Sequence, residues 1–308
     1  MAYYIGIEIE DTKIRLIEMK RRWKTYTVTN KVEIPLSSQV FYEGLIVDES
    51  RVYEVIKEVL KSYKLQGRRA YVLLDPNLVM RWEVKVPCCL EKEIERFLEI
   101  HEKDYLPVSL KDYAINCQRL EGKVNHHQEL GHFMVVGARY NYLNGVIKLL
   151  ENMKFTPMLM TSIVDLLPYY NRHVASLTSY GVLYENDTSF IIALYENNLC
   201  TVSRVFDKGT LMTLWNIEEK VQNGWYEILG WEIHKLMAFY NEAQPNGQIN
   251  HLFTYWQEDL DEVDAYFRDL LGIDVTFSRR VNPDHKLLRE EHSYESLIHL
   301  VKTATEGA

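Results

Sequence analysis

Cysteine is scarce in this 308-residue chain, and its four cysteines form no metal-binding or redox pattern. Cys88 and Cys89 are adjacent, whereas Cys117 and Cys200 stand alone, so there is no CxxC pair of the kind found in zinc ribbons and thioredoxin-like proteins. Four cysteines are also too few for a disulfide framework in a chain of this length. We therefore expect reduced thiols, as in the cytosol.

Long apolar runs are missing as well. The longest, such as residues 190–195, have the length of a strand, whereas a membrane helix needs about 20 residues. The opening MAYYIGIEIE reaches Glu8 and Glu10 without a basic segment or a long apolar core, so we expect no signal peptide. Any work at a membrane would then need something else to hold the protein there.

Basic charge is not in excess. The 35 Lys and Arg face 44 Asp and Glu, and the formal net charge of −9 makes the chain a poor general binder of nucleic acid. Residues 1–70 are richer in basic side chains than the rest. Four of these side chains surround Trp23 at a predicted hairpin tip: Lys20, Arg21, Arg22 and Lys24. This tip is either a solvated turn or a contact for anionic lipid or an acidic partner.

What is present is a globular composition, with 47% hydrophobic and 26% charged residues, and a length that suits about two domains. Apolar and polar residues alternate in two sets of three predicted strands: 3–9, 13–20 and 23–34, then 180–184, 189–195 and 199–206. Each set continues into predicted helices and further strands. This repeated layout is that of the actin/hexokinase superfamily, in which two related halves face a cleft.

Residues 79–157 have a different character. They read as a strand, a helix over 91–105, two strands around a polar loop, and a helix over 141–153. We interpret them as an inserted α+β subdomain. The expected domains are then residues 1–78 plus about 158–175, the insertion 79–157, and residues 176–308.

Several short motifs carry a family resemblance. Residues 5–19 read IGIEIEDTKIRLIEM, residues 84–87 end a strand in VKVP, and residues 270–273 read LLGI. A helix leads to Tyr105-Leu106-Pro107. In this order and spacing the motifs resemble the PilM family of type IV pilus assembly proteins, in the FtsA-like branch of the actin superfamily. The resemblance implies an α/β, actin-like (ribonuclease H-like) two-domain fold with an FtsA-type α+β insertion.

The resemblance also implies a function. PilM-like proteins are cytoplasmic scaffolds that bind the N-terminal cytoplasmic tail of the membrane protein PilN, between the first domain and the inserted one. They connect it to the pilus motor ATPases, and self-assembly into homo-oligomers is left open. The protein would thus be cytoplasmic and recruited to the inner face of the cell membrane through its partner. Our nearest guess for the contact is Tyr105, Leu106 and Pro107; the competing interpretation is that Pro107 stops a helix and Tyr105 packs beneath it.

The nucleotide signatures of the superfamily are all altered. In the first phosphate hairpin Glu10 stands where the glycine belongs, with Asp11 and Thr12 beside it, and the second hairpin has Asp187, Thr188 and Ser189 without a glycine. Residues 253–257, FTYWQ, place two aromatic residues where backbone should approach the base. We expect a vestigial pocket and no catalytic residues, with ATP and magnesium as cofactor only if the pocket still binds.

Two other functions stay open at this point. The runner-up is an active actin-like protein whose nucleotide state controls assembly, and the third is a small-molecule kinase of the hexokinase class. No Walker A, GxGxxG, GxSxG or HExxH sequence supports other enzyme chemistry. His126, His127 and His132 lie close together, but we interpret them as part of a polar loop and expect no metal site.

Overall fold

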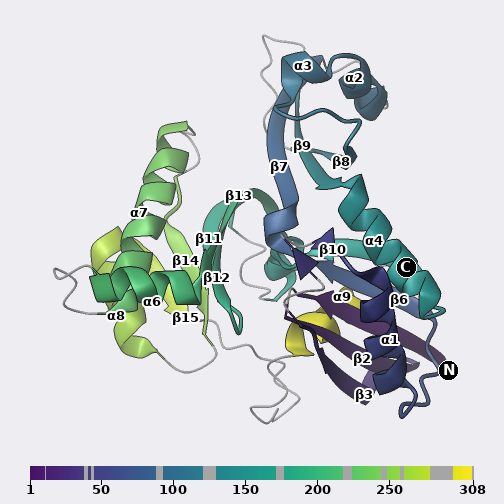
Figure 1. The fold of residues 1–308 in the computed structure, drawn as a ribbon. Helices are drawn as coiled ribbons and strands as arrows, with labels where there is room; N and C mark the ends of the chain where they lie inside the picture. Colours follow the sequence, from purple (N-terminus) through teal and green to yellow (C-terminus); the bar gives the residue numbers. More distant parts are fainter. Residues whose placement is uncertain are drawn as a thin grey trace. The chain divides into compact units, whose positions relative to one another are not determined.

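The computed structural model describes residues 1–10, 12–37, 41–42, 45–87, 93–120, 130–170, 177–217, 224–243, 248–256, 260–277 and 294–306 (Figure 1). The chain divides into two compact units. Unit 1 comprises Met1–Leu166 and Tyr294–Ala308, and unit 2 comprises Leu167–Ser293.

Unit 1 is built on a five-stranded sheet of order β10-β6-β1-β2-β3. Its strands are β1 (Ala2–Ile9), β2 (Lys13–Arg22), β3 (Thr25–Pro35), β6 (Arg69–Leu74) and β10 (Thr156–Ser162). The first three form the antiparallel meander expected from the sequence, and β6 and β10 add in parallel. The strand β10 lies at one edge of the sheet. Pro157 and a register shift before Leu159 interrupt its alternation, which an edge strand tolerates.

Helices cover both faces of this sheet. On one face, α1 (Glu49–Leu60) and α4 (Tyr140–Asn152) bury Ile56 and Val146 against alternate residues of β1, such as Ile7. Asp48 caps α1 by accepting a hydrogen bond from the Arg51 backbone N–H at 2.9 Å. Two short strands, β4 (Phe41–Tyr42) and β5 (Leu45–Ile46), pair with each other, and β5 lies close to α4.

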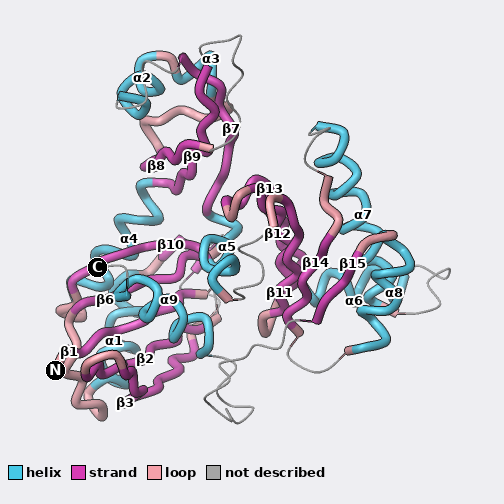
Figure 2. Tube along the Cα trace, turned by 180° about the vertical axis from the view of Figure 1, so that it is seen from behind, coloured by secondary structure: helices cyan, strands magenta, loops and turns pink. Residues whose placement is uncertain are grey.

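The other face carries α9 (Glu295–Glu306), as Figure 2 shows. Gly6 makes this docking possible, because a Cβ there would lie 3.2 Å from Val301 Cγ2 and 3.0 Å from Ile17 Cγ1. We expected residues 176–308 to form the second domain, so α9 corrects that boundary. The helix contacts the first sheet because its apolar side chains Leu297, Leu300 and Val301 are buried there.

The insertion forms its own antiparallel sheet of order β7-β9-β8. Its elements are β7 (Val79–Pro87), α2 (Ile94–Ile100), α3 (Glu102–Tyr105), β8 (Tyr113–Arg119) and β9 (Leu130–Arg139). A small core that includes Val86, Leu98 and Val135 holds it together. The expected helix 91–105 is divided at His101, whose φ of −113° and ψ of 25° are not helical.

The boundary of the insertion also differs from the expected 79–157. The helix α4 belongs to the large core of unit 1, and β10 pairs with β6 in the five-stranded sheet. The separate sheet therefore ends at Arg139. The short elements η1 (Pro76–Leu78), α5 (Ile163–Leu166) and η3 (Leu167–Tyr169) complete this part of the chain.

Unit 2 repeats the topology of unit 1. Its sheet has the order β13-β12-β11-β14-β15, with β11 (Ser179–Glu185), β12 (Ser189–Glu196), β13 (Leu199–Asp207), β14 (His251–Tyr255) and β15 (Asp274–Phe277). The helices α6 (Lys208–Ile217), α7 (Trp225–Ala243) and α8 (Asp261–Leu271) contribute to one core with the sheet. Gly272 ends α8 in the left-handed conformation, with φ of 64°. The internal repeat predicted from the sequence is thus confirmed.

Candidate functional site

The hairpin between β1 and β2 is the first candidate phosphate loop. The Glu10 backbone N–H donates to the Lys13 carbonyl at 3.0 Å, and the Thr12 carbonyl accepts from the Leu36 N–H at 2.8 Å. Thr12 is exposed. Asp11, the third residue predicted for this loop, lies outside the described residues. The turn is therefore closed by its own backbone.

A buried arginine organises the carboxylates beside this hairpin. Arg15 is only 3% exposed, and its Nη1 donates to Glu8 Oε2 at 2.9 Å and to Glu10 Oε1 at 3.1 Å. Its Nε donates to Glu33 Oε2 at 3.3 Å, and Lys13 Nζ lies 3.9 Å from the same oxygen. The Glu10 carboxylate is therefore engaged by an internal cation. The carboxylates of Glu8, Glu10 and Glu33 next to this hairpin are unfavourable for a phosphate group.

The hairpin between β11 and β12 is the second candidate loop, and Asn186 occupies its amides. Asn186 Oδ1 accepts from the backbone N–H groups of Thr188 at 2.9 Å and Ser189 at 2.6 Å, and from Ser189 Oγ at 3.0 Å. Backbone amides of this kind are what a hairpin offers to a phosphate. Here a side chain takes two of them, in the manner of an Asx turn. Asp187 lies within the turn, and Lys208 contacts it from the start of α6: its backbone N–H donates to the Thr188 carbonyl at 2.9 Å and its Nζ to Glu185 at 2.7 Å.

The aromatic residues at the end of β14 are core residues. Tyr255 and Trp256 are only 1% and 3% exposed, so their side chains do not line an open surface. Thr254 Oγ1 and Trp256 Nε1 donate to the two oxygens of Asp264, at 3.1 and 2.8 Å. Burial raises the pKa of Asp264 above its ordinary value. Gln257 lies outside the described residues.

Two of the three residues guessed for partner binding reach the surface of the insertion. Leu106 is 7% exposed and belongs to the core of the inserted sheet. Tyr105 is half-buried and contacts the Phe97 ring edge to face, with centroids 5.4 Å apart. Pro107 is exposed, directly after the end of α3.

Of the groups considered for metal or thiol chemistry, the structure describes His132, Cys117 and Cys200. Among the described residues, no three His, Cys, Asp or Glu side chains are grouped so as to hold a metal ion. His132 Nδ1 lies 3.0 Å from Glu83 Oε1, whereas His126 and His127 lie outside the described ranges. Burial, and to a smaller extent Glu95, raises the pKa of the Cys117 thiol to about 12, so this thiol resists becoming a thiolate.

Glu18 has a role that the sequence motifs did not indicate, and it is only 2% exposed in the middle of β2. One of its oxygens accepts from the backbone N–H groups of Gln66 and Gly67, and the other from Thr29 Oγ1 and Asn30 Nδ2 at 2.8 Å each. Burial by itself raises the pKa of Glu18, but the four hydrogen bonds outweigh it and hold that pKa below its ordinary value. The sequence signal for this role was a charged residue in the middle of a strand whose neighbours are apolar.

These two hairpins, the repeated sheets and the insertion agree with a comparison against known families. A model of the family "Type IV pilus assembly protein PilM" matches residues 6–207, which is more than half of the chain. The chain belongs to the PilM family. The family resemblance expected from the motifs is thereby confirmed. Among the described residues, no helix is both long and apolar enough to cross a membrane.

Solved structures agree with this assignment to the PilM family. A chain of the "PilM-PilN type IV pilus biogenesis complex" matches with a TM-score of 0.71 and 16% identity, over 98% of each chain. The cytoplasmic domain of EpsL, an inner membrane component of the type II secretion system of Vibrio cholerae, matches with a TM-score of 0.53 and 11% identity, over 100% of this chain and 96% of that one. A Bacteroides thetaiotaomicron protein with an actin-like ATPase fold matches with a TM-score of 0.50 and 8% identity, over 98% and 95%. The predicted actin-like fold is therefore confirmed.

Proposed function

We propose that this chain is a scaffold of the type IV pilus machinery that binds the N-terminal cytoplasmic tail of a PilN-like membrane protein. Membership of the PilM family over residues 6–207 carries the proposal. The likeness over 98% of both chains to a protein from a PilM–PilN complex supports it. In this role the protein is recruited to the inner face of the cell membrane by the tail and links it to the motor ATPases.

The scaffold works without nucleotide turnover. Two amides of the second hairpin already donate to Asn186 Oδ1, so a phosphate has to displace that side chain before it can bind there. The first hairpin presents Glu10 and its neighbours Glu8 and Glu33, which repel a phosphate. Both arrangements favour a vestigial pocket, with no ATP or magnesium required.

The tail docks on the inserted sheet. Tyr105, whose ring contacts Phe97, and the exposed Pro107 offer apolar surface, whereas Leu106 belongs to the core beneath. An extended peptide can add to a strand edge through backbone hydrogen bonds and place alternate side chains on such a surface. Tyr105 is then a contact residue and Leu106 a positioning residue.

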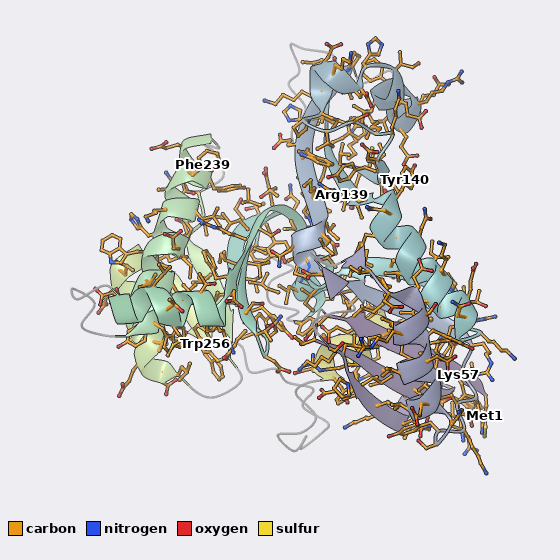
Figure 3. The ribbon with its side chains drawn as sticks, viewed as in Figure 1. Met1, Lys57, Arg139, Tyr140, Phe239 and Trp256 are labelled. Atoms are coloured by element: carbon orange, nitrogen blue, oxygen red, sulfur yellow. The ribbon has the colours of Figure 1, made fainter. Side chains whose placement is uncertain are left out.

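A calorimetric titration with a synthetic PilN-like tail tests the partner. We expect binding well below about 100 μM, and a loss of about tenfold in affinity for Tyr105→Ala, in line with a buried aromatic anchor. Tyr140→Ala is the matched control, because Tyr140 is 46% exposed at the start of α4, outside the inserted sheet (Figure 3). Absence of binding at about 100 μM removes the central interaction of the proposal.

A second titration, with ATP and magnesium, tests the nucleotide site. We expect no saturable heat and no phosphate release. Micromolar binding that is lost in Thr12→Ala or Thr188→Ala variants would show that the hairpins still hold phosphates, and would favour the active actin-like alternative. Pull-down of a motor ATPase with the purified chain, with and without the tail, tests the link to the motor.

A further inference from the structure

The tip of the β2–β3 hairpin carries an apolar side chain that folding does not explain. Trp23 is 92% exposed and has a φ of 60°, in the left-handed region that favours glycine or asparagine. Three basic side chains flank it: Lys20, Arg22 and Lys24. A bulky residue in a strained, solvent-facing position points to a use outside the fold.

The equivalent hairpin of unit 2 shows what the turn itself requires. Between β12 and β13, the two-residue turn is Asn197-Asn198, with φ values of 51° and 65°. Asparagine is the ordinary solution for such a turn. The turn in unit 1 differs, because only Trp23 of its two residues has a positive φ, and tryptophan there departs from the residues that usually adopt that conformation.

The tip is held in place by the neighbouring helix. Arg21 Nε donates to the Trp23 carbonyl at 3.2 Å, and Arg21 Nη1 donates to the Thr305 carbonyl of α9 at 2.7 Å. The hydroxyl groups of Tyr26 and Thr305 also share a hydrogen bond of 2.7 Å. Trp23 is therefore presented on a rigid support, so little conformational entropy is lost when it binds.

The same end of the first sheet gathers further basic side chains. The starts of β1, β6 and β10 lie together, because Ala2 pairs with Arg21 and Arg69 pairs with both Tyr4 and Thr156. Figure 3 marks this end by Met1. Arg68, Arg69 and Lys154 are exposed there. Among the described residues, the acidic groups on the surrounding elements include Glu18, which is buried and accepts four hydrogen bonds, and the exposed Glu58, Glu151 and Glu306 near the ends of α1, α4 and α9.

We propose that this end of unit 1 binds the surface of an anionic lipid bilayer, with Trp23 inserted among the headgroups. Tryptophan prefers the membrane–water interface, and lysine and arginine are attracted to acidic lipids. A hairpin tip with one projecting ring would bury little surface area against a folded protein, whereas the ring can insert between the headgroups of a bilayer. The inference goes beyond the scaffold role, since it needs neither the PilN-like tail nor a motor.

Vesicle flotation of the purified chain tests the proposal. The probes are vesicles of phosphatidylcholine alone and vesicles with about a third phosphatidylglycerol, at low salt and at high salt. We expect flotation with the acidic vesicles only, weakened by salt. Trp23→Asn gives the turn the residue used in unit 2, so it should keep the fold while vesicle binding falls at least about fivefold.

Matched control variants distinguish vesicle binding through the hairpin tip from nonspecific vesicle binding. Trp231→Ala removes another exposed tryptophan, on α7, and Lys235→Glu reverses an exposed charge on the same helix. Both should bind acidic vesicles like the parent chain, whereas the double variant Arg22→Glu, Lys24→Glu should not bind.

Three results would overturn the proposal. One is equal binding to neutral and acidic vesicles. The second is full binding by the Trp23→Asn variant. The third is failure to bind any vesicle together with charge-dependent binding to polyglutamate, which would assign the tip to an acidic protein partner instead. None of them bears on binding of the PilN-like tail, which is measured without lipid.

Discussion

The strands β2 and β12 occupy the same place in two sheets of the same topology, yet only β2 buries charged side chains. The first hairpins of the two sheets have the same register: Ile9 pairs with Ile14 in unit 1, and Glu185 pairs with Phe190 in unit 2. Counted from these pairs, Arg15 is equivalent to Ile191, and Glu18 to Leu194. All of Ser189–Tyr195 is buried and uncharged. Arg15 and Glu18 are equally buried.

The difference shows two ways of holding one topology. In unit 1, Arg15 ties the hairpin to β3, and Glu18 ties β2 and β3 to the loop before β6. In unit 2, stacked aromatic rings connect the elements: the ring centroids of Phe190 in β12 and Trp225 in α7 are 4.7 Å apart, and those of Tyr180 in β11 and Tyr195 in β12 are 5.0 Å apart. Buried charged side chains need specific hydrogen-bonding partners and so specify which segments pack together, whereas apolar contacts stabilise the sheet with little specificity for the partner.

The largest effect should come from Arg15→Met. Removal of the buried guanidinium leaves Glu8, Glu10 and Glu33 close together, at a cost of about 3–5 kcal/mol in the free energy of unfolding at neutral pH. Hydrogen exchange of peptides from β1–β3 measures this loss of stability. Ile191→Met, the equivalent change in unit 2, should cost less than about 1.5 kcal/mol in the β11–β13 peptides; equal losses would contradict the comparison.

The next effect concerns Glu18→Gln. An amide cannot accept from all four donors, so we expect a loss of about 2–3 kcal/mol in urea unfolding, against a small change for Leu194→Met. The folded pKa of Glu18 lies below the ordinary value of 4.5. Its contribution to stability is therefore complete above pH 4.5 and declines as the pH falls through the folded pKa. The difference between parent and variant should shrink over that acidic range, and a constant difference would exclude this role.

A smaller effect separates the two hairpin turns. Asn186→Ala leaves two amides and the Ser189 hydroxyl without their acceptor and should cost about 1 kcal/mol. Thr12→Ala should change stability by less than about 0.5 kcal/mol, since Thr12 is exposed and its described hydrogen bond uses the backbone carbonyl. Thermal unfolding compares both variants with the parent chain. A larger loss at Thr12 would assign its side chain a structural role.

The smallest effect is an exchange between the two hairpin tips. Trp23→Asn should stabilise unit 1 by about 0.5–1 kcal/mol, because asparagine adopts a positive φ more readily than tryptophan. Asn197→Trp should destabilise unit 2 by a similar amount. Differential scanning calorimetry records both. If Trp23→Asn destabilises the protein, Trp23 has a structural role and its exposure is not a sign of binding.

Much of the local structure followed from the sequence alone. Alternation placed the six strands of the two meanders, and Pro87 and Pro107 marked the ends of elements correctly. The motif around Gly6 and Glu18 led to the PilM family, and the structure supplies their physical roles: Gly6 admits α9, and Glu18 satisfies a loop. Both candidate phosphate loops were also placed between the correct pairs of strands, since Asp, Asn and Thr favour turns by their own side-chain chemistry.

Tertiary structure alone decided which elements belong together. Periodicity along α4 and α9 shows an apolar face but cannot say which sheet covers it, because hydrophobic contact is not directional. For this reason the sequence alone did not show that α9 packs on the first sheet, or that α4 and β10 belong to the core and sheet of unit 1 and not to the insertion. In the same way, the sequence shows Glu10, Arg15 and Glu33 as charged residues, but the ion pairs of Arg15 with Glu10 and Glu33 depend on strands that pair in space. The contacts of Asn186 are local to its own turn, with Thr188 and Ser189.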